Sequence, residues 1–114
     1  MPQNDRPIWI EKLLTRGSYS CIEPKWVHFR QGLLRETILD AADGNEHGRE
    51  QLRAAALEQL GDSDPYLIER ALTCLFVVGA SSDVAAVKPS VSHDVEFVRK
   101  AAQTCLVEIR RRLG

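Results

Sequence analysis

Residues 62–78 of this 114-residue chain read DSDPYLIERALTCLFVV, and this stretch decides the fold. Asp64 can cap a helix by accepting a free backbone N–H, and Pro65 suits the first helical position, where its missing N–H is not needed. The residues that follow are apolar on most sides of a helix as far as Val78, and Gly79 predicts its end. Because such a helix is normally covered on several sides, we expect it to be the central helix of an all-α domain.

Helical signals also flank this stretch, and strand signals are almost absent. Apolar spacing and turn residues predict about five further helices, or about six in all, over about residues 7–17, 24–42, 46–60, 82–88 and 95–111. We expect Gly61 to cap the third helix, Pro89 to close the short fifth one and Asp94 to cap the last.

Part of the sequence is repeated after 30 residues, so that a shift by this length aligns Asp64 with Asp94. The same shift aligns the central helix with the last one and superimposes Leu67 on Phe97, Ile68 on Val98, Ala71 on Ala101 and Phe76 on Leu106. Self-similarity of this kind is typical of stacked helical hairpins, which bury their apolar faces only against the next hairpin.

The best copy of the repeated pattern consists of Asp94, Val98, Arg99, Ala102 and Leu106. It is similar to the first helix of HEAT and HEAT-like repeats, and residues 62–65 resemble the turn between two such repeats. The resemblance covers residues 50–112, about two repeats. It implies an α-α superhelix that binds partner proteins along a concave face and the loops beside it, without naming a partner.

Size and composition indicate one globular domain spanning residues 1–114. A chain of this length buries roughly two-thirds of the surface that its unfolded form exposes, and 44% hydrophobic and 27% charged residues are ordinary values. The N-terminus has no apolar secretory segment, and the longest mostly apolar run, residues 71–80, is about half of a membrane span. Three cysteines, an odd number, argue against a disulfide framework, so we expect a cytoplasmic protein without a membrane partner.

Charge is distributed unevenly, although the net charge is only −1. Residues 1–35 carry six basic and three acidic side chains, and residues 70–114 carry seven basic and four acidic ones. Between them, residues 36–69 carry nine acidic side chains against two basic ones. The middle third is therefore an acidic zone between mildly basic flanks.

The candidates for metal binding or nucleophilic catalysis are Cys21, Cys74, Cys105, His28, His47 and His93. None has a metal-binding spacing, and Cys74 and Cys105 fall on the apolar faces of predicted helices, where cysteine packs as a small hydrophobe. Cys21 and His28 lack a recognisable third group that would orient them for catalysis. We therefore expect no metal, no cofactor and no catalytic residue.

The basic run Arg110-Arg111-Arg112 could contact nucleic acid. However, basic side chains also complement the negative C-terminal end of a helix. A pI near 6.3 and an acidic centre are the wrong electrostatic pattern for DNA or RNA. We therefore expect a protein partner rather than a nucleic acid.

Acidic residues gather in two predicted turns between helices, and the candidate partner-binding site consists of Asp40, Asp43, Glu46, Glu50, Asp62 and Asp64. We expect stacked hairpins to bring the two turns to neighbouring positions, where one negative patch attracts a basic partner. The alternative is that these acids only cap helices and solubilise turns, which explains part of the role of Asp64.

The sequence thus predicts a non-enzymatic protein-interaction module. Its most concrete form is a bacterial immunity or antitoxin-type inhibitor that covers a basic toxin with the acidic patch. A scaffold or adaptor subunit of a larger complex is the alternative. A less favoured alternative is a HEAT-like lyase that resembles the phycobilin lyases. This resemblance implies a groove that can hold a tetrapyrrole, and the chain is short for such a groove.

Overall fold

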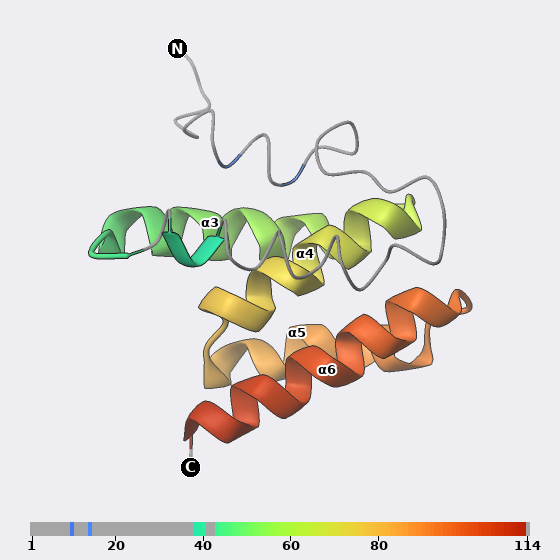
Figure 1. Ribbon diagram of the computed structural model, residues 1–114. Coiled ribbons are helices and arrows are strands. Elements are labelled where there is room, and N and C mark those ends of the chain that lie inside the picture. Colours follow the sequence, from blue (N-terminus) through green and yellow to red (C-terminus); the bar gives the residue numbers. More distant parts are fainter. Residues whose placement is uncertain (1–9, 11–13, 15–37, 41–42, 114) are drawn as a thin grey trace.

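The structure is a computed structural model that describes Ile10, Leu14, residues 38–40 and residues 43–113. Within these residues the regular elements are all helical, which confirms the all-α class (Figure 1). They are the α-helices α3 (Glu46–Gln59), α4 (Pro65–Val78), α5 (Val84–Val87) and α6 (Glu96–Leu113) and the 3₁₀ helices η2 (Ser81–Asp83) and η3 (Lys88–Ser92). The helices predicted over residues 7–17 and 24–42 lie largely outside the described residues. None of the described helices is long and apolar enough to cross a membrane.

Helix α4 occupies the centre of the described helices, as predicted from its apolar surface. Of its 14 residues, 10 are buried. Asp64 caps its first turn, since the Asp64 Oδ1 accepts the N–H of Tyr66 at 2.9 Å. At the other end the N–H of Gly79 donates to the carbonyl of Leu75 at 2.8 Å, so both predicted ends are confirmed.

Helices α3 and α6 cover α4 from two sides. Figure 1 shows α3 running antiparallel to α4 and α6 running parallel to it. The repeat superimposes three pairs of buried positions of α4 and α6, namely Ile68 and Val98, Leu72 and Ala102, and Leu75 and Cys105, whereas most other positions are more exposed in α6 than in α4. Ile10, Leu14 and Ile38 belong to the same apolar cluster, so the core extends beyond the four labelled α-helices.

The predicted end of α5 before Pro89 is confirmed, whereas the predicted cap of α3 is wrong in detail. Leu60, and not Gly61, is the C-terminal cap of α3, and its N–H donates to the carbonyl of Ala56 at 3.1 Å. Among the described glycines the left-handed φ belongs to Gly44, at 65°, so Gly61 supplies no left-handed turn. Pro89 does not stop the chain from coiling, because it lies at the start of η3, where a proline needs no N–H.

The predicted Asp94 cap of α6 is wrong, because the Asp94 carboxylate accepts no hydrogen bond within the described part of the chain and a histidine holds the turn that precedes this helix. The N–H of Val95 donates to the His93 Nδ1 at 3.0 Å. Arg99 strengthens this turn, since its Nη1 donates to the carbonyls of His93 and Asp94 at 2.8 and 2.9 Å. An imidazole nitrogen therefore accepts a backbone donor here, as a carboxylate would at an ordinary cap.

A buried ion pair fastens α3 to the turn that follows α4. The Arg53 Nε lies 2.7 Å from the Asp83 Oδ2, and its Nη2 lies 2.8 Å from the Oδ1. Asp83 is only 2% exposed and also accepts the N–H of Ala80 at 2.7 Å. Burial by itself raises the pKa of Asp83, but the hydrogen bonds from Arg53 and Ala80 together hold it below its ordinary value. Asp83 is therefore a structural carboxylate.

The basic run at the end of α6 also has a structural role. The Arg112 Nη1 donates to the carbonyl of Phe76 at 2.6 Å, and its Nη2 donates to that of Gly79 at 2.8 Å. These carbonyls belong to the C-terminal end of α4, where a cation also opposes the negative end of the helix. Arg111 forms two hydrogen bonds with Glu108, at 2.9 and 2.6 Å.

Candidate functional site

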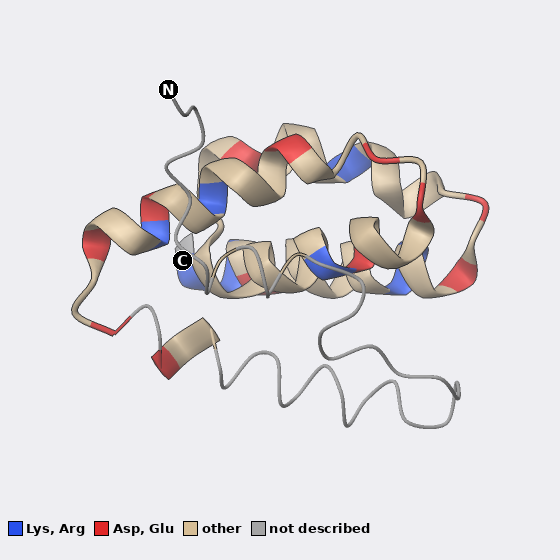
Figure 2. Ribbon diagram, turned by 90° about the horizontal axis from the view of Figure 1, so that it is seen from above, with Lys and Arg blue, Asp and Glu red and all other residues tan. Residues whose placement is uncertain are grey.

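Most of the described acidic residues lie at two ends of the molecule, as the red segments of Figure 2 show, and the others lie along the helices between these ends. The first acidic surface consists of Asp40, Asp43, Glu46 and Glu50 at the start of α3, and all four are exposed. Gly44 and the capping residue Asn45, whose Oδ1 accepts the N–H of Gly48 at 3.0 Å, shape the turn that presents them.

Among the described residues, one member of the first acidic surface, Glu50, forms an ion pair with a neighbouring arginine. The Glu50 Oε1 lies 3.0 Å from the Nη1 of Arg53, which follows it by three residues, or about one turn, in α3. The carboxylates of Asp40, Asp43 and Glu46 accept no hydrogen bond from another described residue. Glu46 stands in the first turn of α3, where a negative charge offsets the positive end of the helix. Most of the carboxylates of the first acidic surface are therefore solvated.

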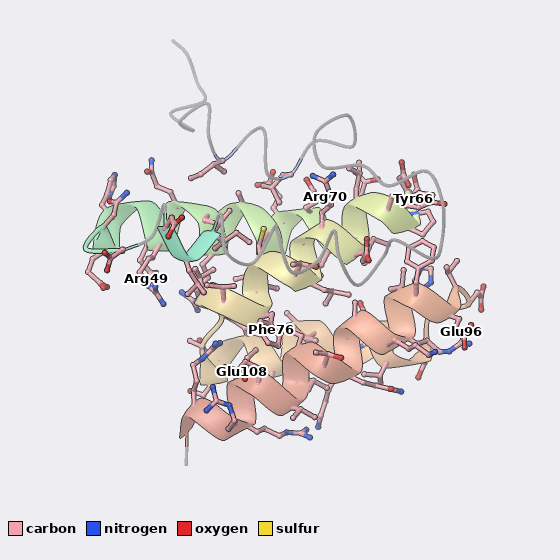
Figure 3. All side chains as sticks on the ribbon, in the orientation of Figure 1. Arg49, Tyr66, Arg70, Phe76, Glu96 and Glu108 are labelled. Atoms are coloured by element: carbon pink, nitrogen blue, oxygen red, sulfur yellow. The ribbon has the colours of Figure 1, made fainter. Side chains whose placement is uncertain are left out.

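The second acidic surface lies where α4 and α6 begin, around a pair of aromatic rings. It consists of Asp62, Asp64, Asp94 and Glu96, with Tyr66 and Phe97 between them. The ring centroids of Tyr66 and Phe97 are 5.0 Å apart, which ties the two helix starts together. Figure 3 shows Tyr66 and Glu96 at this same end of the molecule.

The structure does not bring the two predicted acidic turns together, so that expectation is wrong. The turn with Asp43 precedes α3, and the turn with Asp62 and Asp64 follows it. A helix of 14 residues separates them, which corresponds to roughly 20 Å. Two turns at opposite ends of one helix cannot form a single patch. The predicted boundaries of this helix already implied that separation.

Capping uses part of the acidity of the second acidic surface. The Asp62 Oδ1 accepts the N–H of Asp64 at 2.8 Å, and the Asp64 Oδ1 accepts that of Tyr66. A carboxylate has about four acceptor positions, so one such bond leaves capacity for a cation. These hydrogen bonds already fix the conformation of the turn. Binding a partner would therefore cost little conformational entropy at this surface.

Sequence reasoning missed Tyr66, Phe97, Asp94 and Glu96 as members of a site. Tyr66 is 38% exposed, although large aromatic side chains are usually better covered. Its neighbour Phe97 belongs to a different helix, far along the chain, so no local pattern connects them. The internal repeat was the available signal, since it superimposes Leu67 on Phe97 and Asp64 on Asp94.

The two described cysteines are core residues. Cys74 and Cys105 are free thiols, and both are fully buried in the apolar cluster, as predicted. Cys21 and His28 lie outside the described residues, and His47 is exposed. The described part of the chain contains no group of three or more residues of the metal-binding types placed to hold an ion.

Native-state thiol chemistry provides a direct test of this core. Burial raises the pKa of the Cys74 thiol to about 12, although the charge of Arg70 acts in the opposite direction. In a Cys21→Ser variant we therefore expect Ellman's reagent to find no fast thiol in the native protein at about pH 8 and two after unfolding. Rapid reaction of either thiol in the native protein would show that this part of the core is open.

The chain was compared with protein-family models, with curated proteins and with solved structures, and none of the three comparisons gives a match.

Proposed function

We propose that this chain is a non-enzymatic protein-interaction module that binds a basic partner protein. In this proposal the second acidic surface makes the central contact, with Tyr66 as its anchor. The first acidic surface adds to the field that draws the partner in, because clustered charge speeds association more than it strengthens the final complex.

The observation that carries this proposal is the exposed Tyr66 at the end of the molecule where the starts of α4 and α6 carry four acidic residues. Tyrosine is enriched among the residues that dominate binding energy, because it offers a large rigid surface and a polar tip. A lysine or arginine that approaches the ring also meets the carboxylates, and the ring face itself attracts a cation. The first acidic surface has Leu39 as its exposed apolar neighbour, and leucine is a rarer anchor.

We also propose that the described helices are HEAT-like hairpins. The parallel course of α4 and α6 supports this reading, and so does the burial of three superimposed pairs: Ile68 with Val98, Leu72 with Ala102, and Leu75 with Cys105. In such an arrangement the starts of successive first helices lie side by side, so acidic residues at those starts in adjacent repeats build one surface. That is the relation between Asp64 and Asp94.

The test is affinity capture with the full chain as bait, from the cells that produce it. We expect a captured protein of high pI and expect Tyr66→Ala to weaken its binding about tenfold or more, because an anchor residue contributes about 2 kcal/mol or more. Biolayer interferometry with the purified partner would measure this. Binding that is unchanged by Tyr66→Ala and by Asp94→Asn with Glu96→Gln would contradict the proposal.

The first acidic surface supplies the matched control. Asp43→Asn with Glu46→Gln removes the same number of charges at the other end of the molecule. We expect this variant to slow association at low salt while leaving dissociation nearly unchanged, since remote charge acts mainly on the approach. Circular dichroism should show that both variants remain folded, because all four residues are exposed.

The most concrete version of the proposal is an immunity or antitoxin-type inhibitor of a basic toxin, and an adaptor subunit is the alternative. Co-expression separates them: an inhibitor restores growth to cells that make the captured protein, whereas an adaptor does not. The tetrapyrrole-lyase reading predicts a shift in visible absorbance when a bilin is added. An unchanged spectrum would exclude that reading.

A further inference from the structure

The ring of His93 holds the turn that precedes α6. Its Nδ1 accepts the N–H of Val95 at 3.0 Å, so the neutral ring carries its proton on Nε2. The carbonyl of Val95 in turn accepts the first backbone bonds of α6, from the N–H of Val98 at 3.1 Å and that of Arg99 at 3.2 Å. The side chain of Val95 packs against the apolar core. One imidazole nitrogen therefore fixes the residue from which α6 begins.

This contact is compatible with only one protonation state of His93. A charged imidazole has a hydrogen on both nitrogens and accepts no hydrogen bond. After protonation two N–H groups would face each other across 3.0 Å, so the ring has to turn away from Val95. His93 is half-buried, so the ring can gain a proton without unfolding of the core. Histidine is the side chain that ordinarily changes its charge between about pH 5 and 8.

The charged groups around this turn act on the ring in two directions. Arg99 donates its Nη1 to the carbonyl of His93 at 2.8 Å, and this cation and the positive end of α6 oppose a charge on the ring. The carboxylates of the second acidic surface favour that charge and can accept hydrogen bonds from a ring that has left Val95. Besides Arg99, the charged or titratable groups of the elements that adjoin the turn are Asp94 in the turn itself, Glu96 and Lys100 in the first turns of α6, Asp62, Asp64 and Tyr66 at the start of α4, and Lys88 of η3.

We propose that His93 is a proton-sensitive latch for the turn that presents Asp94 and Glu96. While the ring is neutral, the latch is closed, and the turn fixes these two residues at the start of α6. When the ring is charged, the latch opens, the turn loosens, and the imidazolium pairs with a carboxylate of the second acidic surface. Protonation then also adds a positive charge to this surface.

The inference deepens the proposed function, and its regulatory meaning rests on that function. A basic partner would bind less tightly to a surface with an open latch, so acid would favour release. The latch itself is a property of the chain alone and can be tested without a partner. The latch can therefore fail while partner binding stands, and partner binding can fail while the latch stands.

The test is an NMR titration of the full chain from about pH 8 to about pH 5, in which the ring protons of His93 and the backbone amides are followed together. We expect the Val95 amide to shift with the same midpoint as the His93 ring. Its protection against hydrogen exchange, relative to the unfolded rate at each pH, should fall about fivefold, because this is roughly what a neutral hydrogen bond contributes.

His93→Asn is the matched variant, because the new amide oxygen can accept the N–H of Val95 at any pH. We expect its Val95 amide to keep one position across the titration. His47→Asn removes the exposed histidine of α3 and should leave the change at Val95 as in the wild type. Asp94→Asn with Glu96→Gln should also retain this change, which separates the effect of the imidazole from that of the neighbouring carboxylates.

Several outcomes would overturn the latch. One is a Val95 amide that keeps its shift and its protection while the His93 ring gains a proton. Another is a Val95 amide that titrates in His93→Asn as it does in the wild type. A His93 ring that stays neutral in the folded chain down to about pH 5 would overturn it as well.

Discussion

Replacing Asp83 by Asn should lower the free energy of unfolding by about 2–4 kcal/mol. The substitution keeps the shape of the side chain but removes the charge that two Arg53 nitrogens contact. Arg53 would then be held against a neutral amide at a site where Asp83 is 2% exposed. Arg53 keeps some contact with solvent, which is why we expect less than the full effect of a completely buried pair. Urea unfolding followed by circular dichroism measures the loss.

Glu50 provides the matched control because it pairs with the same arginine. Its side chain is 67% exposed, so Glu50→Gln should change stability by less than about 1 kcal/mol. The double variant Arg53→Met with Asp83→Leu should be more stable than Asp83→Asn alone, since no unpaired charge is left inside. Equal effects of Asp83→Asn and Glu50→Gln would show that the buried pair contributes no more than the surface pair.

The same pair should make stability depend on pH in acid. The pKa of Asp83 is lower in the folded chain than in the unfolded one. Its contribution is therefore complete above the unfolded value of about 4 and is lost as the pH falls through the lower folded value. The stability difference between wild type and Asp83→Asn should be constant from about pH 7 to 5 and shrink below about pH 4. A difference that widens in acid would contradict this assignment.

Replacing Leu72 by Ala should lower the free energy of unfolding by about 2–5 kcal/mol. Leu72 is 0% exposed and lies in α4, the helix that α3 and α6 cover from two sides. Truncation removes apolar contact and leaves a cavity that the surrounding helices cannot fully close. Thermal and urea unfolding should both report the loss.

Leu39 is the control for this prediction because it carries the same side chain at the surface. It is 54% exposed, so Leu39→Ala should change stability by less than about 1 kcal/mol. If the two variants lost similar amounts of stability, α4 would not be the centre of the core.

Local physical chemistry explains which parts of the fold could be predicted. The start of α4 follows from Asp64 and Pro65, and its end follows from Gly79, because capping groups act within a few residues. The burial of Cys74 and Cys105 follows from their positions on apolar helix faces. The predicted Asp94 cap of α6 is wrong, because the His93 ring takes the local role of backbone acceptor in the turn before this helix.

The site was predicted less well because it depends on which helices become neighbours. The acidic character of residues 36–69 was evident from composition alone. The separation of the two acidic turns follows from the predicted helix over about residues 46–60, which lies between them. The Tyr66–Phe97 ring contact, the hydrogen bond from Val95 to the His93 ring and the Arg53–Asp83 pair were not predicted.

The sequence by itself determined the all-helical class, the central position of α4 and the place where this helix begins and ends. These features rest on interactions over one or two helical turns and on the periodicity of apolar residues. Only the tertiary structure decided that Asp62 and Asp64 share a surface with Asp94 and Glu96, that Tyr66 stands at this surface, and that Arg112 caps α4. The groups involved lie on different helices, far apart in the sequence, and only the packing of α3, α4 and α6 brings such distant groups into contact.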